Sequence, residues 1–159
     1  MRDNIQMRNN KKIKVCFVSS SGGHYEQLRN LKSLLEEYEG FYVTEKTDYL
    51  YDAKYMLTSI GSNDIFFLFK LAKLFLTSLK IWFREAPDVV ISNGAVICLP
   101  FCFWAKVFRK KFIFIETFAR VTDASKTGKM MYKYADLFIV QWKSLLEVYP
   151  NAVYGGSIY

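Results

Sequence analysis

The sequence is poor in the residues that build metal sites and disulfide frameworks. Its 159 residues include three cysteines and a single histidine, His24. An odd number of cysteines gives no complete disulfide framework, and Cys98 and Cys102 have no histidine or further cysteine at metal-binding spacing. We therefore expect Cys16, Cys98 and Cys102 to be reduced, apolar thiols, as in cytosolic proteins, and we expect no metal site.

Acidic residues are also scarce relative to basic ones. Fifteen Asp and Glu stand against 22 Lys and Arg, which gives a formal net charge of +7. Such a balance implies an anionic partner, which is a nucleic acid, an acidic membrane or a phosphorylated substrate. The basic residues interleave with aromatic ones on expected helices and no DNA or RNA motif is present, so we expect no nucleic-acid partner.

The amino terminus lacks an export signal. Residues 1–12 are polar and basic and have no apolar centre of the kind found in signal peptides. We expect a mobile basic tail at 1–12, followed by a single domain over 13–159, since this length suits one domain. The expected location is the cytoplasmic face of the cell membrane.

The most informative local pattern is a strand, a glycine-containing turn and a helix. Residues 13–18 predict a buried strand, Ser19-Ser20-Ser21-Gly22-Gly23-His24 a turn, and 25–35 a helix. In a parallel sheet this turn lies at the carboxyl end of the strand, where ligands bind. Glycines let a ligand approach the backbone, and N–H groups at a helix start favour phosphate. The spacing matches neither a Walker A loop nor a dinucleotide fingerprint, so a turn without a ligand remains an alternative.

Strands and helices alternate along the rest of the chain. The expected strands are 41–44, 88–92, 112–115, 136–140 and 152–154, and the expected helices are 65–84, 95–108, 126–134 and 142–148. This alternation predicts an α/β, Rossmann-like and mostly parallel sheet with right-handed crossovers. Residues 45–64 give no clear pattern. The turns at 21–24, 93–94 and 116–127 should then meet at one edge of the sheet.

Residues 65–84 form the most apolar stretch, and their polar residues fall on one narrow stripe of a helix. These are Lys70, Lys73, Thr77, Lys80 and Arg84. The length approaches that of a membrane span, but internal lysines are costly at the bilayer centre. We expect a helix at the membrane interface, with Trp82 at the boundary and Trp104 in a second aromatic and basic patch at 100–111. The alternative is a helix packed on the sheet with its lysines in water, and we expect both to hold in part.

Several motifs in a fixed order resemble the asparagine-linked glycosylation protein fourteen family and its bacterial capsule and exopolysaccharide relatives. They are Ser20-Ser21-Gly22-Gly23-His24, Pro87-Asp88-Val89-Val90-Ile91-Ser92-Asn93-Gly94, Ile115-Glu116-Thr117, Ala119-Arg120-Val121, Thr127-Gly128-Lys129, Ala135-Asp136, Val140-Gln141-Trp142 and Tyr149-Pro150. The resemblance covers nearly the whole chain after the tail. The loop after Asn93-Gly94 departs from the Pro-Gly-Thr-Cys of eukaryotic members, which fits a bacterial relative.

The resemblance implies the amino-terminal half of a GT-B glycosyltransferase on its own polypeptide. The implied partner is a small carboxyl-half subunit that holds most of the UDP-sugar donor, so no cofactor is expected on this chain. The implied function is to recruit this partner and to help bind a polyprenyl-diphosphate-linked acceptor at the membrane, in capsule or exopolysaccharide biosynthesis. The alternative is a scaffold that recruits and activates the partner without contributing to catalysis.

Inverting transfer to a sugar hydroxyl needs a general base, for which the candidates are His24 and Glu116. The alternatives are that His24 caps a helix and that Glu116 accepts backbone N–H groups of its own loop. For Arg120 we expect an ion pair with Glu116, with a phosphate contact as the alternative. The residues expected at the acceptor diphosphate are Ser21, Gly22, Gly23, Asn93, Gly94, Arg120 and Thr127.

The carboxyl-terminal segment 153–159 is apolar and aromatic, so it should not extend freely into water. Following the resemblance, we expect Ile158 and Tyr159 to contact the partner and the isolated chain to transfer no sugar. The alternative is a tail that folds back on its own sheet.

Overall fold

The computed structural model describes residues 12–48, 51–61 and 65–158. The expected basic tail, apart from Lys12, and Tyr159 lie outside this part of the chain. The strands are β1 (Lys14–Val18), β2 (Glu39–Glu45), β3 (Tyr55–Leu57), β4 (Val89–Ser92), β5 (Lys111–Ile115), β6 (Leu137–Val140) and β7 (Val153–Tyr154). The helices are α1 (Gly23–Arg29), α2 (Leu34–Glu37), α3 (Phe67–Glu85), α4 (Cys98–Val107) and α5 (Lys126–Met131), with a 3₁₀ helix at Lys143–Leu146.

The strands form one seven-stranded sheet in the order β3-β2-β1-β4-β5-β6-β7. Every pairing between neighbouring strands is parallel. The chain proceeds outward from β1 through β2 to β3 and then returns to place β4 on the other side of β1. This reversal puts a topological switch point between β1 and β4, where ligands bind in doubly wound sheets.

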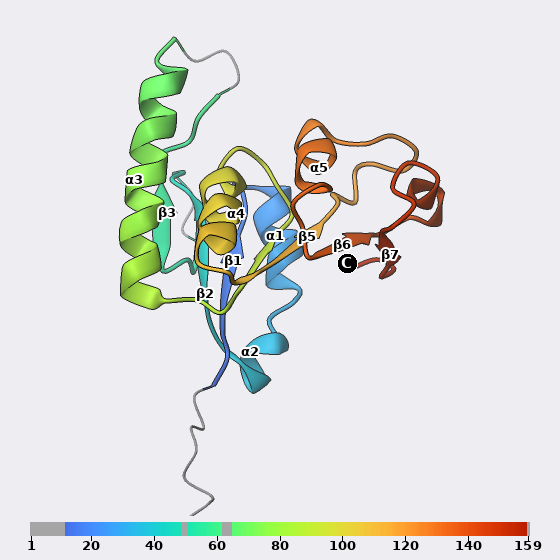
Figure 1. The fold of residues 1–159 in the computed structure, drawn as a ribbon, viewed down its shortest axis with the longest axis horizontal. Helices are drawn as coiled ribbons and strands as arrows, with labels where there is room; N and C mark the ends of the chain where they lie inside the picture. The colour runs from blue at the N-terminus through green and yellow to red at the C-terminus, as the bar shows by residue number, and fades with distance from the viewer. Residues whose placement is uncertain (1–11, 49–50, 62–64, 159) are drawn as a thin grey trace, which may run out of the picture.

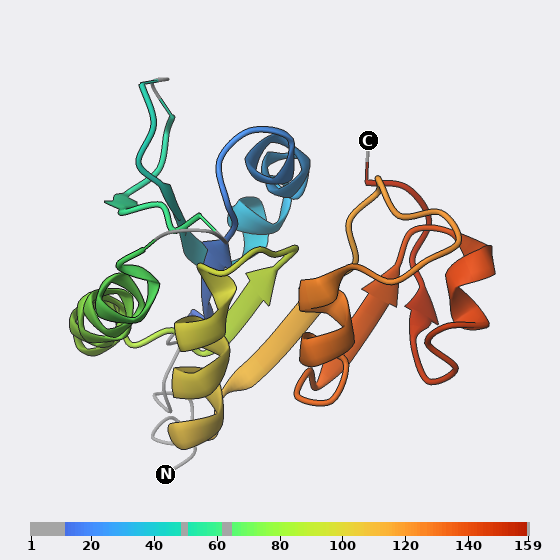
Figure 2. The ribbon, with the colours of Figure 1, turned by 90° about the horizontal axis from the view of Figure 1, so that it is seen from above.

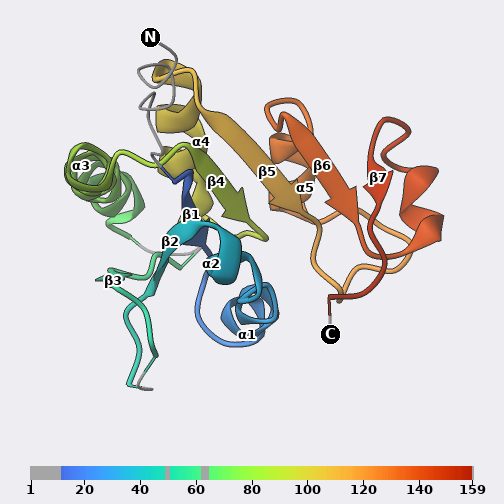
Figure 3. The same ribbon diagram turned by 90° about the horizontal axis from the view of Figure 1, so that it is seen from below.

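Helices cover the two faces of the sheet unequally (Figure 1). Helices α3, α4 and α5 lie on one face, and the short helices α1 and α2 lie on the other, as the two perpendicular views show (Figures 2 and 3). The alternation of β1 follows this division: Cys16 and Val18 join the core under α3 and α4, while Val15 and Phe17 face Leu28 of α1. The predicted fold class is therefore confirmed.

Some element boundaries differ from the expectation. The single helix expected at 25–35 is broken, because Asn30 ends α1 and a turn precedes α2. Within that turn Leu31 N–H donates to the Leu28 carbonyl at 3.0 Å, and Leu34 N–H donates to the Leu31 carbonyl at 3.0 Å. These tighter i→i−3 bonds keep Leu31, Leu34 and Leu35 packed on the sheet although the α-helix is interrupted.

Trp82 was expected at a membrane boundary, and this prediction is wrong. Its side chain is buried, and its ring stacks on Phe108 with 5.5 Å between centroids. The reason is helical spacing: Trp82 falls on the same face of α3 as Leu74 and Ser78, and this face packs on the sheet. Among the described residues, no helix has both the length and the apolar character needed to cross a bilayer.

Candidate functional site

Three turns meet at the carboxyl edge of the sheet and enclose a pocket of about 240 Å³. It is lined by His24, Asn93, Gly94, Ala95, Thr117, Ala119, Arg120, Ser125 and Thr127. A second hollow of about 240 Å³ shares His24, Thr117 and Ala119 with the first and also includes Gly23, Gln27 and Phe118. The expected convergence of the three turns is thus confirmed. The two hollows together bring six of the predicted site residues around one opening: Gly23, His24, Asn93, Gly94, Arg120 and Thr127.

The glycine-containing turn starts α1, and only glycine suits its conformation. Gly22 is the N-cap of α1 with φ +75°, in the left-handed region that side chains disfavour. Its N–H donates to the Tyr51 hydroxyl at 2.9 Å, and the N–H of Ser20 donates to the Gly94 carbonyl at 3.2 Å. The N–H of Ser21 bonds the Glu45 carboxylate. The turn therefore uses several of the donors that we expected to bind phosphate for its own structure.

Glu45 is a residue of this edge that the sequence did not reveal. It ends β2, is mostly buried, and accepts hydrogen bonds from Ser21 N–H and from the Ser59 side chain. Burial raises the pKa of Glu45, and these two bonds offset part of that rise. The signal that could have found it is its position, because it follows Thr44 at the carboxyl end of a predicted strand.

His24 is the second residue of α1, and its ring borders the pocket. Among the described residues, the buried Nδ1 atom has no hydrogen-bond partner. Burial lowers the pKa of His24, and the negative charge of Glu116 offsets this only in part, so the imidazole is neutral at pH 7. The N-cap of α1 is Gly22 and no side chain caps the helix, so the capping alternative for His24 is wrong. A neutral imidazole with an unpaired nitrogen can accept a proton.

Asn93 follows β4 and is 1% exposed. Its Nδ2 donates to the His24 carbonyl at 2.8 Å and to Gln27 Oε1 at 3.1 Å, whereas its buried Oδ1 has no partner in the described part of the chain. An amide with both hydrogens in use can only accept. An ionised diphosphate also only accepts, so this geometry favours a sugar hydroxyl or N–H at Asn93 over the diphosphate that we expected there.

A chain of buried amides holds Asn93 and connects the turns. Gln27 Nε2 donates to Gln141 Oε1 at 3.3 Å, and Gln141 Nε2 donates to the Glu116 carbonyl at 2.9 Å. Both glutamines are almost completely buried. Sequence reasoning gave no role to Gln27, although a polar residue one position before the buried Leu28 of α1 was a signal.

Glu116 is fully buried behind the pocket. Its carboxylate accepts hydrogen bonds from Thr117 N–H at 2.9 Å, Ser125 N–H at 3.3 Å and the Tyr149 hydroxyl at 2.7 Å. Gly128 permits this packing, because a Cβ there would lie 2.0 Å from Glu116 Oε2. These bonds agree with the alternative that Glu116 accepts backbone N–H groups of its own loop. Glu116 is not among the residues that line the pocket.

Arg120 does not pair with Glu116 as expected. Its Nη1 donates to Asp123 Oδ2 at 2.5 Å within the same loop. The correction has a simple cause, since Asp123 lies three residues away at the surface while the Glu116 carboxylate is buried and already bonded. The Arg120 side chain remains at the border of the pocket, where its charge faces any bound anion.

The carboxyl-terminal segment returns to the sheet. Ile158 N–H donates to Gln141 Oε1 at 3.1 Å, the Ile158 carbonyl accepts from Asn30 Nδ2 at 2.9 Å, and the side chain packs on the cluster around Phe17. These contacts agree with the alternative that the tail, at Ile158, folds back on its own sheet. Tyr159 lies outside the described residues, so partner binding by this pair stays a prediction.

The outward surface of α3 and α4 is apolar; we refer to it as the α3–α4 face. Its residues, each 49–91% exposed, are Ile65, Phe66, Leu68, Phe69, Leu76, Phe83, Phe103 and Val107. Lys73, Lys80 and Arg84 are exposed on the adjoining flank of α3, and Lys70 on that flank is half-buried. Trp104 is half-buried and donates from Nε1 to Ser78 Oγ at 3.0 Å, which ties α4 to α3.

Most of the chain matches a known protein family. Residues 56–158 match the family described as oligosaccharide biosynthesis protein Alg14 like. The chain belongs to this family. A human relative is 30% identical over 179 residues, covering 92% of the Alg14-like chain and 83% of its own length. A rat relative is 39% identical over 100 residues, covering 55% of this chain and 46% of its own length. Both are UDP-N-acetylglucosamine transferase subunits by name.

Solved structures agree with the fold expected for the Alg14-like chain. The UDP-N-acetylglucosamine 2-epimerase of Rickettsia bellii superposes with a TM-score of 0.72 at 16% identity, over 92% of this chain and 45% of that one. MurG of Acinetobacter baumannii superposes with a TM-score of 0.64 at 14% identity, over 80% and 41%. At these identities the likeness shows the fold alone, which is the amino-terminal half of a GT-B fold. The chain spans less than half the length of either structure and of the rat relative.

Proposed function

We propose that this chain is the membrane-associated, acceptor-binding subunit of a two-chain UDP-sugar glycosyltransferase. Its acceptor is a polyprenyl-diphosphate-linked saccharide of capsule or exopolysaccharide biosynthesis, at the cytoplasmic face of the membrane. The observation that carries the proposal is the pocket at the switch point, which His24 and Asn93 both line and beside which His24 Nδ1 and Asn93 Oδ1 have no hydrogen-bond partner among the described residues. The names of the Alg14 relatives, which are transferase subunits, support it.

The chemistry follows from these atoms. A hydroxyl of the acceptor sugar gives its proton to the His24 imidazole while its oxygen forms the new bond to C1 of the donor sugar, and UDP leaves with the bonding electrons. Asn93 Oδ1 accepts a second hydroxyl or an N–H of the acceptor and thereby orients it. The Arg120 guanidinium at the border of the pocket faces the diphosphate. Glu116 acts by holding the loop that carries Thr117 and Arg120.

The donor is assigned mainly to a partner subunit. The curated relatives are transferase subunits by name, and a GT-B site lies between two halves of which the described fold matches one. A small carboxyl-half subunit would supply the other wall of the opening next to His24. In this proposal the chain binds no cofactor of its own, and its contribution to transfer depends on the partner.

The α3–α4 face supplies the membrane contact. Large apolar side chains on this face insert into the lipid boundary, and the basic flank of α3 then lies at the level of the headgroups. A peripheral position of this kind keeps the pocket beside the surface that holds the lipid tail of the acceptor.

A matched pair of glycine variants tests the pocket. A Cβ at Gly23 or at Gly61 would have no neighbour within 4 Å, so each position has open space where a valine side chain would start. With the partner present, Gly23→Val should lower sugar transfer about 100-fold or more by displacing the acceptor, while Gly61→Val leaves it unchanged. Both variants should keep the melting temperature and partner co-purification of the wild type. Wild-type transfer by Gly23→Val would exclude the site, and full transfer by His24→Gln as well would favour the scaffold alternative.

Charge reversal tests the membrane contact. Changing Lys70, Lys73 and Lys80 to Glu should weaken binding to anionic vesicles by at least about 100-fold, since each basic residue near such a surface contributes about 1 kcal/mol. The matched control changes the same three residues to Arg, which keeps the charge and should keep binding. Equal vesicle sedimentation of the two triple variants would contradict the proposal.

A further inference from the structure

Three buried amide side chains form a continuous series of hydrogen bonds that ends at the turn carrying His24; we call Gln141, Gln27 and Asn93 the amide relay. Gln141 Oε1 accepts from Gln27 Nε2 at 3.3 Å, and Gln27 Oε1 accepts from Asn93 Nδ2 at 3.1 Å. Asn93 Nδ2 also donates to the His24 carbonyl at 2.8 Å. The three amide residues are 1–2% exposed, so little water competes for these bonds.

Two backbone groups fix the orientation of the Gln141 amide, because neither can reverse its role. The Glu116 carbonyl can only accept, and Gln141 Nε2 donates to it at 2.9 Å. The Ile158 N–H can only donate, and Gln141 Oε1 accepts it at 3.1 Å. The Gln141 oxygen is therefore the atom that faces α1, and Gln27 has to meet it with its nitrogen.

The orientation of the Asn93 amide follows from the same alternation of donors and acceptors. Gln27 uses Nε2 for Gln141 and keeps Oε1 as an acceptor, and the His24 carbonyl is a second acceptor. A reversed Asn93 amide would set its own oxygen against both of these oxygens in a buried site. The nitrogen of Asn93 therefore supports the His24 carbonyl, and its buried oxygen, which has no partner among the described residues, remains beside the pocket.

The bond between Asn93 and the His24 carbonyl ties the start of α1 to the turn after β4. No side chain caps α1, whose N-cap is Gly22. Ser20 N–H donates to the Gly94 carbonyl at 3.2 Å and joins the same two turns. A reversed Asn93 would exchange an attractive contact between these turns for a repulsion between oxygens, and the His24 ring would move with its turn.

We propose that Gln27 and Gln141 are positioning residues of the pocket around His24. They act through Asn93, whose amide they orient, and thereby hold the turn that carries His24. Gln141 lines neither hollow, so its effect on transfer is indirect, whereas Gln27 also borders the second hollow. The inference rests on the proposed function, because it takes this pocket as the site of the sugar acceptor, but the relay itself can be tested on the chain alone.

The first experiment uses the full chain without a partner. His24 is the single histidine, so its ring gives one unambiguous set of NMR signals, and their change with pH reports its pKa. In the wild type, burial lowers the pKa of His24 from the ordinary value of 6.5. Gln27→Met keeps an unbranched side chain of similar length but breaks the relay. It should raise the pKa of His24 toward 6.5, because a loosened turn exposes the ring to water.

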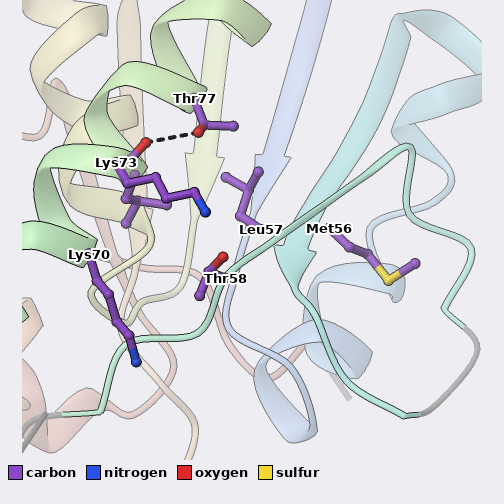
Figure 4. A pocket seen from close by; sticks show the side chains of 7 residues that line it. Met56, Leu57, Thr58, Lys70, Lys73 and Thr77 are labelled. Atoms are coloured by element: carbon purple, nitrogen blue, oxygen red, sulfur yellow. Dashed lines mark hydrogen bonds between the residues drawn. The ribbon is translucent and has the colours of Figure 1, made fainter. Parts of the chain in front are cut away.

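Thr77→Val is the control for this experiment. It removes one side-chain hydrogen bond, from Thr77 Oγ1 to the Lys73 carbonyl at 2.8 Å, on α3 across the sheet from α1 (Figure 4). The pKa of His24 should keep its wild-type value in this variant. If the pKa is unchanged in Gln27→Met as well, the amide relay does not position His24 and the inference is wrong.

The second experiment measures sugar transfer with the partner present and compares two changes at one position. Gln27→Met should lower kcat/KM for the sugar acceptor about tenfold at every pH. Gln27→Glu should do the same at pH 8, where its carboxylate can only accept hydrogen bonds. Toward pH 6, burial favours the neutral carboxyl group, which offers one donor and one acceptor as the amide does. Its kcat/KM should then recover at least about fivefold relative to the wild type.

The pH series separates orientation from packing. Titratable groups that all three proteins share, His24 and Glu116 among them, cancel in the ratio of variant to wild type. A purely structural role of Gln27 would give no recovery in acid, so a constant ratio for Gln27→Glu would overturn the inference. Melting temperatures show that each variant is folded at the temperature of the assay.

A double variant tests whether the two glutamines act as one unit. Gln141→Met should lower kcat/KM about as much as Gln27→Met, and the double variant should lose no more than either, because each change breaks the same relay. Multiplied losses in the double variant would mean that the glutamines act separately, which would overturn the inference. Absence of transfer by the wild type with its partner would instead contradict the proposed function, and the His24 titration would still decide on the relay.

Discussion

The two edges of the sheet use polar residues in opposite ways. At the amino edge three carboxylates of the described residues each meet a lysine: Glu85 with Lys14 and Lys54, Asp88 with Lys110, and Asp136 with Lys106 and Lys111. At the carboxyl edge the buried groups are uncharged amides, a neutral imidazole and two carboxylates, Glu45 and Glu116, which are bonded to N–H and hydroxyl groups. Within the part of the chain that the structure describes, these carboxylates of the first edge are paired, whereas Asn93 Oδ1 and His24 Nδ1 at the second edge have no hydrogen-bond partner.

This difference separates stability from function. A buried polar atom without a hydrogen bond costs free energy, and native proteins keep few of them. Two such atoms beside one pocket are consistent with a site whose missing donors come from a ligand. The amino edge contains no comparable pair of open atoms among the described residues, and its ion pairs have the character of structural ties between β1, β3, α3 and the starts of β4 and β5. Variants at the two edges should therefore affect different measurements.

The largest effect is expected at His24. As general base, His24 should contribute about 10²–10⁴-fold to sugar transfer, so His24→Gln should lower the rate by that factor with the partner present. Because burial lowers the pKa of His24 from its usual value, the imidazole is neutral at pH 7. The wild-type rate should be constant near neutral pH and fall only in acid, as the ring becomes protonated. His24→Gln should lack this acid limb.

Two outcomes would contradict that assignment. A variant rate that keeps the acid limb would place the titrating base on the partner, and an unchanged rate would reduce His24 to a structural residue. Thermal unfolding serves as the control, since the melting temperature should not change: the Nδ1 atom has no partner to lose.

Glu85 should show the converse behaviour, with a large effect on stability and none on transfer. Its buried carboxylate accepts from Lys54 at 2.7 Å, Tyr55 at 2.5 Å and Lys14 at 3.3 Å. Glu85→Gln should cost about 1.5–3 kcal/mol of unfolding free energy, the range for hydrogen bonds to a charged group. Chemical denaturation at pH 7 measures this loss.

The pH dependence sharpens the same prediction. Burial alone would raise the pKa of Glu85, but the bonds from Lys54, Tyr55 and Lys14 outweigh it and lower the pKa to about 2. The depressed pKa means that the carboxylate stabilises the fold fully above pH 4.5, its unfolded value, and that this contribution is lost as the pH falls toward 2. The stability gap between wild type and Glu85→Gln should therefore narrow from pH 7 to pH 3. A constant gap would mean that packing rather than charge dominates.

The sequence was sufficient to predict the strands and which turns lie at the carboxyl edge, but not the hydrogen bonds between those turns. Apolar runs such as Phe112–Ile115 predicted strands, and parallel strand order then placed Gly23, Asn93 and Arg120 at one edge. The hydrogen-bond partners at that edge were not predictable, because Glu116 and Tyr149 are 33 residues apart and Gln27 and Gln141 are 114 apart. Only the folded sheet brings such pairs together, and so the free atoms of Asn93 and His24 could not be recognised.

Other errors have local causes. Arg120 was paired with the wrong carboxylate because spacing does not reveal that Glu116 is buried and Asp123 exposed. Trp82 was predicted at the membrane boundary because the helix at 65–84 is apolar on two sides, and its sequence does not show which of the two sides packs inward. The three-residue strand β3 was missed because an edge strand of that length has too few residues for a period-two pattern.

The smallest effect on stability is expected for Lys106, whose partner carboxylate is more exposed than that of Glu85. Lys106 Nζ lies 2.7 Å from Asp136 Oδ2, but the two side chains are 39% and 29% exposed, against 4% for Glu85. Solvent screens such a pair, and Asp136 keeps its bond from Phe112 N–H at 2.9 Å when the lysine is removed. Lys106→Gln should therefore cost between about 0 and 1 kcal/mol and leave transfer unchanged. Denaturant unfolding at low and at high salt measures this loss of unfolding free energy. Any loss found at low salt should disappear in 1 M salt, where the screening length is about 3 Å. If Lys106→Gln costs as much unfolding free energy as Glu85→Gln, burial does not determine how much each ion pair of the amino edge contributes to stability. The difference between the two edges of the sheet would then depend on charge pairing alone.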